Sequence, residues 1–277
     1  MPSSEYSNTP EGWASTGFGA RDLASIALTG AIALAALLSG AVLAVSGNTV
    51  APKYCVLFAV AMALVAALGV TMRRHRHGLS SAVRTVDAAG VRATEVRYSA
   101  TQFGILVALM TCLALLCLLG AAEAYLRSDS SGFPGLSVLL GGAGVFLASF
   151  GIAAATGRLR RGAVALSGAG ISQRGWSFES RLDWSAVAGI NPGHNGYPVI
   201  LVIGYTNAEW TRRQITRIWR IDRLPPVPMI ELDCRKFDID PDALLRYLQT
   251  YVESAAARDE LGTEAALIRA RALEQSS

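Results

Sequence analysis

The sequence predicts an α+β membrane protein in which four transmembrane helices, arranged as two antiparallel hairpins, precede a β-rich aqueous domain. Hydrophobic residues make up 52% of the chain and charged residues only 17%, which is too apolar for an ordinary water-soluble protein. Long apolar runs dominate the chain before residue 157, whereas apolar and polar residues alternate after it. A basic junction at residues 157–162, with three arginines, separates the two halves.

Each apolar run is long enough to cross a hydrocarbon core of ~30 Å. The first run, residues 24–46, carries no charge, and a short turn leads from it to the second run at residues 54–72. Such a short connection forces an antiparallel hairpin. The third and fourth runs, residues 102–122 and 136–156, repeat the arrangement after a second polar loop.

These runs define the domains that we expect along the chain. Residues 1–22 are rich in Ser, Gly, Thr and Pro, which is typical of a disordered leader. Residues 23–157 form the transmembrane domain, which includes a basic loop at residues 73–100. Residues 158–277 form the aqueous domain.

Basic residues in the loops predict the orientation. The loop at residues 73–100 contains six arginines and the junction three, whereas the opposite loops contain only Lys53 and Arg127. Because cytoplasmic loops carry the excess of Lys and Arg, both termini are predicted to be cytoplasmic in a multi-pass protein of the bacterial inner (plasma) membrane.

The membrane runs themselves contain few features of a transport pathway. None has an ionisable residue in its interior, and proton or ion pathways normally need one there. This disfavours a proton-coupled transporter, whereas an oligomeric channel remains an alternative function. Small residues recur every four positions, which either allows close helix packing or reflects an alanine-rich composition; examples are Ala36, Gly40, Ala44, Ala59, Ala63, Ala67, Gly104, Ala108, Cys112, Gly144 and Ala148.

The inner loop predicts a strand, a turn around Asp87 and Gly90, and a second strand. It can be aligned with residues 163–180, where Ser167 and Gly170 bound a similar turn. Two helix hairpins, each followed by a strand-turn-strand, would indicate an old duplication, and a chance match of Gly and Ala is the alternative.

After the junction, the period of two indicates strands that are buried on one face. Phe178 and Leu182 alternate with Glu179 and Arg181, for example, and a loop is expected at residues 191–196. The expected strands are residues 163–167 and 170–174 as a hairpin, 176–184, 187–190, a central strand at 199–205, and 229–237.

Arginine clusters are the candidate binding residues. Residues 211–223 hold five arginines around Trp219, in a spacing that fits a strand or a helical turn equally well. Both this segment and the start of the inner loop could contact phosphates of lipid headgroups, with a solvated basic surface as the alternative. The candidate anion or headgroup contacts are Arg212, Arg213, Arg217, Arg220, Arg223, Arg73, Arg74 and Arg76.

No residue pattern predicts a catalytic, cofactor or metal site. His75 and His77 lie among three arginines and would face opposite ways on a helix, and His194 has no Cys or second His nearby. The four cysteines, Cys55, Cys112, Cys117 and Cys234, form no CxxC pair and are interpreted as packing residues.

The end of the chain predicts two helices. Asp240 followed by Pro241 is a typical helix start, and Leu244 and Leu248 belong to the apolar stripe of that helix. A second helix is expected after Gly262 and runs to about residue 273.

Strands followed by an amphipathic helix resemble the pleckstrin-homology (PH)-like domains of bacterial membrane proteins. The runs at residues 237–245 and 258–263 look like the end of such domains in uncharacterised actinobacterial multi-pass proteins. The resemblance implies an antiparallel β-barrel closed by the helix, and a role in binding lipid, peptide or protein. The first hairpin turn, residues 167–170, departs from the lipid-binding members because it has no basic residue.

The predicted function is therefore that of a non-enzymatic scaffold at the inner membrane. Its expected partners are the bilayer, anionic lipid headgroups, and a membrane or cytoplasmic protein, with no nucleic acid and no cofactor. The alternatives are a subunit of a small oligomeric channel or transporter and, after it, a membrane enzyme.

Overall fold

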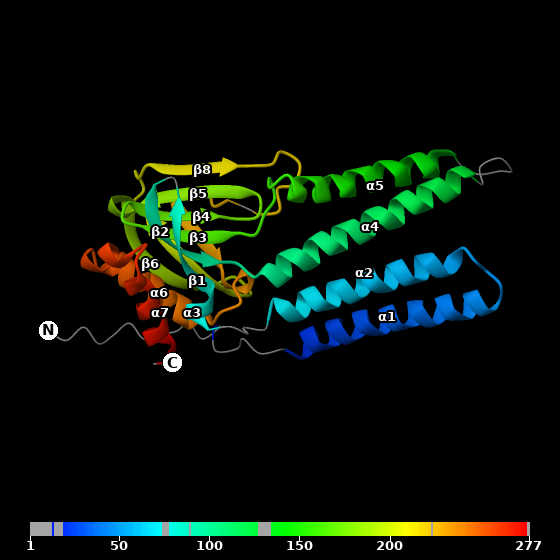
Figure 1. Ribbon diagram of the computed structural model, residues 1–277, viewed down its shortest axis with the longest axis horizontal. Coiled ribbons are helices and arrows are strands. Elements are labelled where there is room, and N and C mark those ends of the chain that lie inside the picture. The colour runs from blue at the N-terminus through cyan, green and yellow to red at the C-terminus, as the bar shows by residue number, and fades with distance from the viewer. Residues whose placement is uncertain are drawn as a thin grey trace. The chain divides into compact units, whose positions relative to one another are not determined.

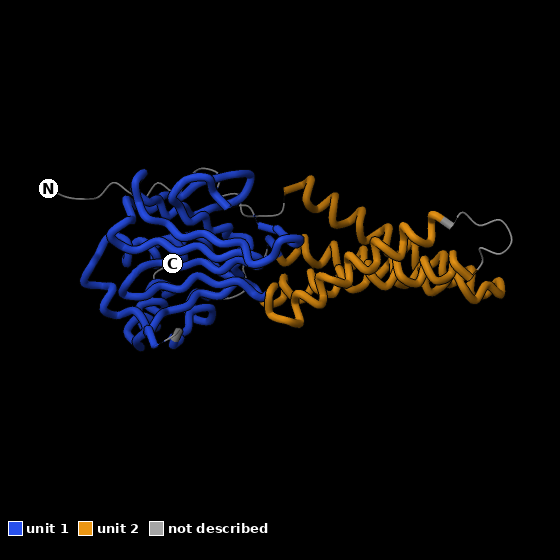
Figure 2. The backbone as a smooth tube through the Cα atoms, turned by 90° about the horizontal axis from the view of Figure 1, so that it is seen from above, with its two compact units in different colours: residues 1–17, 72–99, 160–277 blue, residues 18–71, 100–159 orange. Residues whose placement is uncertain are grey.

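The computed structural model describes residues 13, 19–73, 78–88, 90–126, 134–222 and 224–275, and divides the chain into two compact units. The helical unit consists of Phe18–Thr71 and Ala100–Leu159. The sheet unit consists of Met1–Gly17, Met72–Ser99 and Arg160–Ser277 (Figure 2). Most of the inner loop thus belongs to the same compact unit as the C-terminal part of the chain.

The helical unit contains four helices that are long and apolar enough to cross a membrane, as predicted. The first helix, α1, begins at Ala20 because Asp22 accepts a hydrogen bond from the Gly19 N–H at 3.2 Å and so caps a polar first turn. The helices are α1 (Ala20–Val45), α2 (Ala51–Thr71), α4 (Ala100–Leu126) and α5 (Pro134–Ala155) (Figure 1).

Small residues allow close packing at two of the predicted places. A Cβ added to Gly40 of α1 would lie 2.8 Å from the Cys55 Cβ of α2, and one on Gly144 of α5 would lie 2.7 Å from Leu118 of α4. Gly104 has no neighbour within 4 Å. The repeat of small residues therefore marks helix contacts within each hairpin, but not at every member.

Polar contacts join the two hairpins where α2 meets α4. The Gln102 amide donates to the Thr71 carbonyl at 3.2 Å, and Cys112 Sγ lies 3.2 Å from the Leu57 carbonyl. At the other end of the pair, Glu123 Oε2 lies 2.7 Å from Lys53 Nζ. Neutral and charged hydrogen bonds thus pair α2 and α4 at both ends and in the middle.

The larger sheet of the sheet unit has six strands and is antiparallel throughout, in the order β1-β2-β3-β4-β5-β8. The inner loop forms the predicted strand-turn-strand as β1 and β2, and β2 pairs with β3, so that Val96 opposes Val164. The strands are β1 (Val83–Ala88), β2 (Val91–Arg97), β3 (Ala163–Ser167), β4 (Gly170–Arg174), β5 (Phe178–Asp183) and β8 (Trp210–Gln214).

The smaller sheet has three antiparallel strands in the order β6-β7-β9. Its strands are β6 (Val187–His194), β7 (Pro198–Gly204) and β9 (Met229–Asp233), and β7 is central as predicted. The loop expected at residues 191–196 is wrong in its first part, because β6 continues to His194. An edge strand can include Pro192, since its missing N–H is not needed on the open side.

The closed barrel implied by the resemblance is not found. The strands of the described residues form two open sheets, and no hydrogen-bonded ladder joins them. Two features account for this difference. The inner-loop hairpin lengthens one edge of the larger sheet, and three prolines between β8 and β9, at positions 225, 226 and 228, cannot donate to a closing ladder.

Helices close the core of the sheet unit. Helix α6 (Pro241–Glu253) begins where predicted, because Asp240 accepts a hydrogen bond from the Ala243 N–H at 3.2 Å, and it buries Tyr247 and Leu248. Helix α7 (Glu264–Gln275) follows Gly262 and packs against α3 (Leu79–Ala82) and β1. The inner loop is therefore held by a strand ladder on one side and by a helix on the other.

Candidate functional site: an arginine-lined pocket

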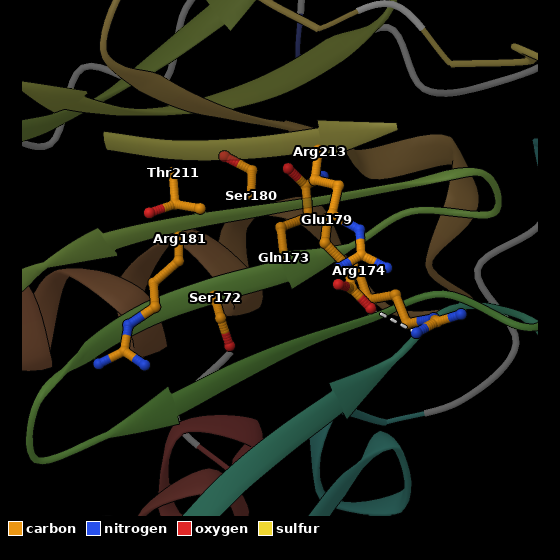
Figure 3. A pocket seen from close by; sticks show the side chains of 8 residues that line it. All are labelled: Ser172, Gln173, Arg174, Glu179, Ser180, Arg181, Thr211 and Arg213. Carbon is orange, nitrogen blue, oxygen red and sulfur yellow. Dashed lines mark hydrogen bonds and ion pairs between the residues drawn. The ribbon is translucent and has the colours of Figure 1, made fainter. Parts of the chain in front are cut away.

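A pocket of about 350 Å³ lies over β4, β5 and β8 of the larger sheet (Figure 3). Arginines project at both of its ends in this view, with Arg174 and Arg213 at one end and Arg181 at the other. The lining residues are Ser172, Gln173, Arg174, Glu179, Ser180, Arg181, Thr211 and Arg213.

Strand register brings arginines from three strands into one row. Arg213 opposes Glu179, which opposes Arg174. Arg174 in turn opposes Ala163, which opposes Arg97. Because residues that oppose one another in a ladder share a face, Arg97, Arg174 and Arg213, which we call the arginine row, project from the same face of the sheet.

Two carboxylates form ion pairs with members of the arginine row. Glu179 Oε1 lies 2.5 Å from Nη1 of Arg174, and this ion pair is visible in Figure 3. The Arg174 side chain is 20% exposed and that of Glu179 45%, so the arginine is the more enclosed partner. Glu95 Oε2 lies 2.6 Å from Nε of Arg97, so two carboxylates among three guanidinium groups leave the row with only a small excess of positive charge.

Further arginines raise the positive charge at the same end of the sheet. Burial lowers the pKa of the Arg174 guanidinium, and the positive charge of Arg160 lowers it further. Burial also lowers the pKa of Arg161, and the charges of Arg97 and Arg84 act in the same direction. Since like charges disfavour one another, a bound anion would relieve this repulsion.

The basic junction reaches the arginine row through a close backbone contact. The Tyr98 N–H donates to the Gly162 carbonyl at 2.9 Å, and the Arg161 Nε–H donates to the Tyr98 carbonyl. A Cβ on Gly162 would lie 2.4 Å from the Tyr98 ring, so glycine is needed there. Gly162 therefore allows the start of β3 to lie beside the end of β2, which brings the junction arginines next to Arg97.

The predicted candidate arginines separate into different environments. Arg213 belongs to the arginine row, whereas the neighbouring Arg212 opposes Ser180 and stacks on the Trp210 ring at 4.9 Å, with a hydrogen bond to the Pro225 carbonyl at 3.1 Å. Arg217 and Arg220 are exposed beyond the end of β8 and do not line the pocket.

The candidates at the start of the inner loop are not part of the pocket either. Arg73 is exposed just after the end of α2. Arg74, Arg76 and Arg223, as well as His75 and His77, lie outside the described residues.

Two members of the arginine row, Arg97 and Arg174, are not among the candidates predicted from the sequence. Arg97 was counted only toward membrane orientation, and Arg174 only as the end of a strand. The alternation of polar and apolar residues could have placed Arg174 on the solvent-exposed face of its strand. The register that brings it beside Arg97 and Arg213 could not be read from the sequence.

A buried ion pair fixes the segment after β8. Asp222, with a side chain 4% exposed, accepts a hydrogen bond from the Trp176 N–H at 3.0 Å and pairs with Lys236. The Lys236 ammonium also lies 5.3 Å from the Trp176 ring and 5.9 Å from the Tyr98 ring. This network ties residues 215–222 to the core, so the loop that carries Arg217 and Arg220 has a defined anchor.

The chemistry of the site is that of anion binding. Guanidinium groups can grip a phosphate or carboxylate by two parallel hydrogen bonds. Within the described ranges, no three His, Cys, Asp or Glu side chains are grouped to hold a metal ion.

Comparisons of the chain with protein-family models, with curated proteins and with solved structures find no match.

Proposed function

We propose that this chain is a non-enzymatic scaffold of the bacterial inner membrane, and that its sheet unit binds anionic lipid headgroups at the cytoplasmic face. The observation that carries the proposal is the arginine row, which has more guanidinium groups than paired carboxylates and two members of which, Arg174 and Arg213, line one pocket. The succession of strands followed by α6 supports a relation to PH-like domains, in an open rather than closed form.

The positions of these arginines along the chain support a lipid ligand. Arg97 precedes α4 by three residues, and Arg161 follows α5 by six. An extended chain covers at most about 3.6 Å per residue, so Arg97 lies within about 11 Å of the start of an apolar helix. Anionic headgroups attract basic residues at such positions by about 1 kcal/mol each.

The pairing of β2 with β3 supports a single aqueous side for the sheet unit. One strand follows the first helix hairpin and the other follows the second, and both must lie on the same side of the membrane to pair. The arginine excess on that side favours the cytoplasm.

Channel or transporter activity has less support. Within the four helices, the Asp, Glu, Lys and Arg residues lie near the ends, as Lys53 in α2 and Glu123 in α4 do. An ion pathway would need such groups at membrane depth.

The test measures which lipids the full-length protein retains. Protein reconstituted with equal amounts of phosphatidylglycerol and phosphatidylcholine is extracted, and its bound lipids are counted by native mass spectrometry. The combined change Arg97→Gln, Arg174→Gln and Arg213→Gln is expected to reduce retained phosphatidylglycerol at least about tenfold, since each arginine contributes about 1 kcal/mol.

Two controls separate the arginine row from general charge. Arg271→Gln removes an exposed arginine of α7 and should leave retention unchanged. The combined change Arg212→Gln, Arg217→Gln and Arg220→Gln removes equal charge from residues 211–223, the segment predicted from the sequence to contact anions. It should reduce retained phosphatidylglycerol less than the row variant does. Equal retention by the row variant and the unchanged protein would refute the proposal.

A further inference from the structure

The side chain of Trp13 is held against a strand that lies far from it in the sequence. Trp13 is only 3% exposed. Its indole N–H donates to the Gly193 carbonyl at 2.8 Å, across 180 positions of the chain. A buried tryptophan usually has a hydrogen-bond partner for its indole N–H, and the Gly193 carbonyl provides that partner here.

The receiving strand is suited to an indole. Gly193 lies on β6, at the edge of the smaller sheet, and opposes Val199, which is 3% exposed. A Cβ on Gly193 would lie 3.0 Å from Val199 Cγ2 and 3.4 Å from Leu201 Cδ1. The strand thus offers a backbone carbonyl without a side chain of its own, next to apolar side chains.

We propose that β6 around Gly193 forms a binding site for a tryptophan side chain, and that Trp13 of the same chain is its occupant. The ligand class is a peptide segment that supplies one indole, with the N–H directed at the Gly193 carbonyl. The site is independent of the arginine row, because it lies on the other sheet and involves none of its residues.

The covalent connection between Trp13 and β6 strengthens their contact. Trp13 and Gly193 belong to one chain, so binding is intramolecular and acts at an effective concentration in the millimolar range. The contact holds Trp13 itself against β6 of the sheet unit.

The first test measures the protection of Trp13 in the full-length protein. All five tryptophans are labelled as 5-fluorotryptophan, and the Trp13 signal is assigned by its loss in Trp13→Phe. A water-soluble gadolinium chelate should broaden this signal about as little as that of Trp184, which is 6% exposed. Broadening equal to that in a free peptide of residues 1–19 would overturn the proposal.

The second test fills the vacated site from solution. A fluorescent peptide of residues 1–19 should bind full-length Trp13→Ala protein at least about tenfold more tightly than the unchanged protein, because the tethered indole competes in the latter. The same peptide with Ala at position 13 should bind neither protein.

The variants make the outcome decisive. Trp13→Phe keeps the ring but removes the N–H, so it should compete with the peptide less well than tryptophan and better than alanine. Equal binding of the Trp and Ala peptides to Trp13→Ala protein would exclude an indole site. All of these readouts are unaffected by lipid retention, so this proposal and the headgroup proposal can fail separately.

Discussion

The helical unit and the sheet unit bury their side chains in different ways. In the four helices that are long and apolar enough to cross a membrane, only 11–22% of the most apolar window is buried within the chain, although these windows are strongly hydrophobic. In the sheet unit, the fully buried residues include Tyr98, Tyr247 and Phe237, and the charged Asp222 is 7% exposed. Apolar surface that the chain leaves uncovered suits lipid, whereas buried polar groups require partners inside the protein.

Glycine also has a different role in each unit. Gly40 and Gly144 have ordinary helical conformations and allow helices to approach one another. In the sheet unit, Gly262 combines a φ of +77° with a backbone contact to Arg92 that leaves no room for a Cβ. Substitutions can therefore test each unit by its own mechanism.

The largest effect is expected from Asp222→Ala in the sheet unit. The change leaves the Lys236 ammonium, whose side chain is 19% exposed, without its carboxylate, and such a loss costs about 3–5 kcal/mol. All five tryptophans lie outside the helices of the helical unit, so denaturant unfolding followed by tryptophan fluorescence reports on the sheet unit. Asp183→Ala is the control, because its pair with Arg181 is 59% and 58% exposed and should contribute about 0–1 kcal/mol. Equal losses would show that burial of the pair has no consequence.

The second largest effect is expected from Gly262→Ala, which should lower the free energy of unfolding by about 2–4 kcal/mol in the same fluorescence measurement. An added Cβ would lie 2.5 Å from the Arg92 Cβ and would also be strained by the positive φ. Gly90→Ala separates the two causes, since Gly90 has a φ of +82° but no neighbour within 4 Å, and should lose only about 1 kcal/mol. If both variants lost the same amount, the contact between Gly262 and the inner loop would not contribute.

In the helical unit, Gly40→Ala is expected to cost about 1–2 kcal/mol. The new methyl group would press against the Cys55 Cβ and separate α1 from α2. Gly142→Ala is the matched change on α5, where nothing lies within 4 Å and the higher helix propensity of alanine should be neutral or favourable. The measurement is loss of helical circular dichroism during titration with a denaturing detergent. Comparable loss in both variants would contradict close packing at Gly40.

The smallest effect concerns the ion pair between Glu260 and Arg269. Hydrogen bonds from Arg269 lower the pKa of Glu260, and the two side chains are 27% and 36% exposed. The folded pKa is therefore below the unfolded value of about 4.3, so the stabilisation is present above that pH and is lost as the pH falls through the folded pKa.

Glu260→Gln should accordingly reduce the free energy of unfolding by about 0.5–1 kcal/mol at neutral pH, and the difference from the unchanged protein should diminish as the pH falls through the folded pKa of Glu260. Glu209→Gln, at an exposed carboxylate, controls for the change in net charge. A difference that did not diminish on acidification would mean that Glu260 acts through packing rather than through charge.

Local patterns predicted much of the fold. The four membrane helices, the β3–β4 hairpin, the central strand β7 and the cap of α6 at Asp240 all depend on neighbouring residues. Hydrophobic periodicity and capping express such short-range preferences directly. The length of β6 was mispredicted, because a proline and a glycine usually indicate a loop and an edge strand tolerates both.

The candidate site was predicted only in part. Residues 211–223 were identified as an arginine segment, but only Arg213 of that segment joins the arginine row. Adjacent strand residues point to opposite faces, so Arg212 and Arg213 separate as soon as residues 210–214 form a strand. The contact between Trp13 and Gly193 had no signal in the sequence at all.

Residue patterns alone were enough to predict the four apolar helices, the alternation typical of strands, and the excess of arginine in the inner loop and the junction. The folded chain was needed to show that the inner-loop hairpin extends the C-terminal sheet and that Arg97 shares a face with Arg174 and Arg213. The difference arises from the range of the interactions. Helices and turns form between residues close in the chain, whereas strand register is set by pairing between segments that two membrane helices separate.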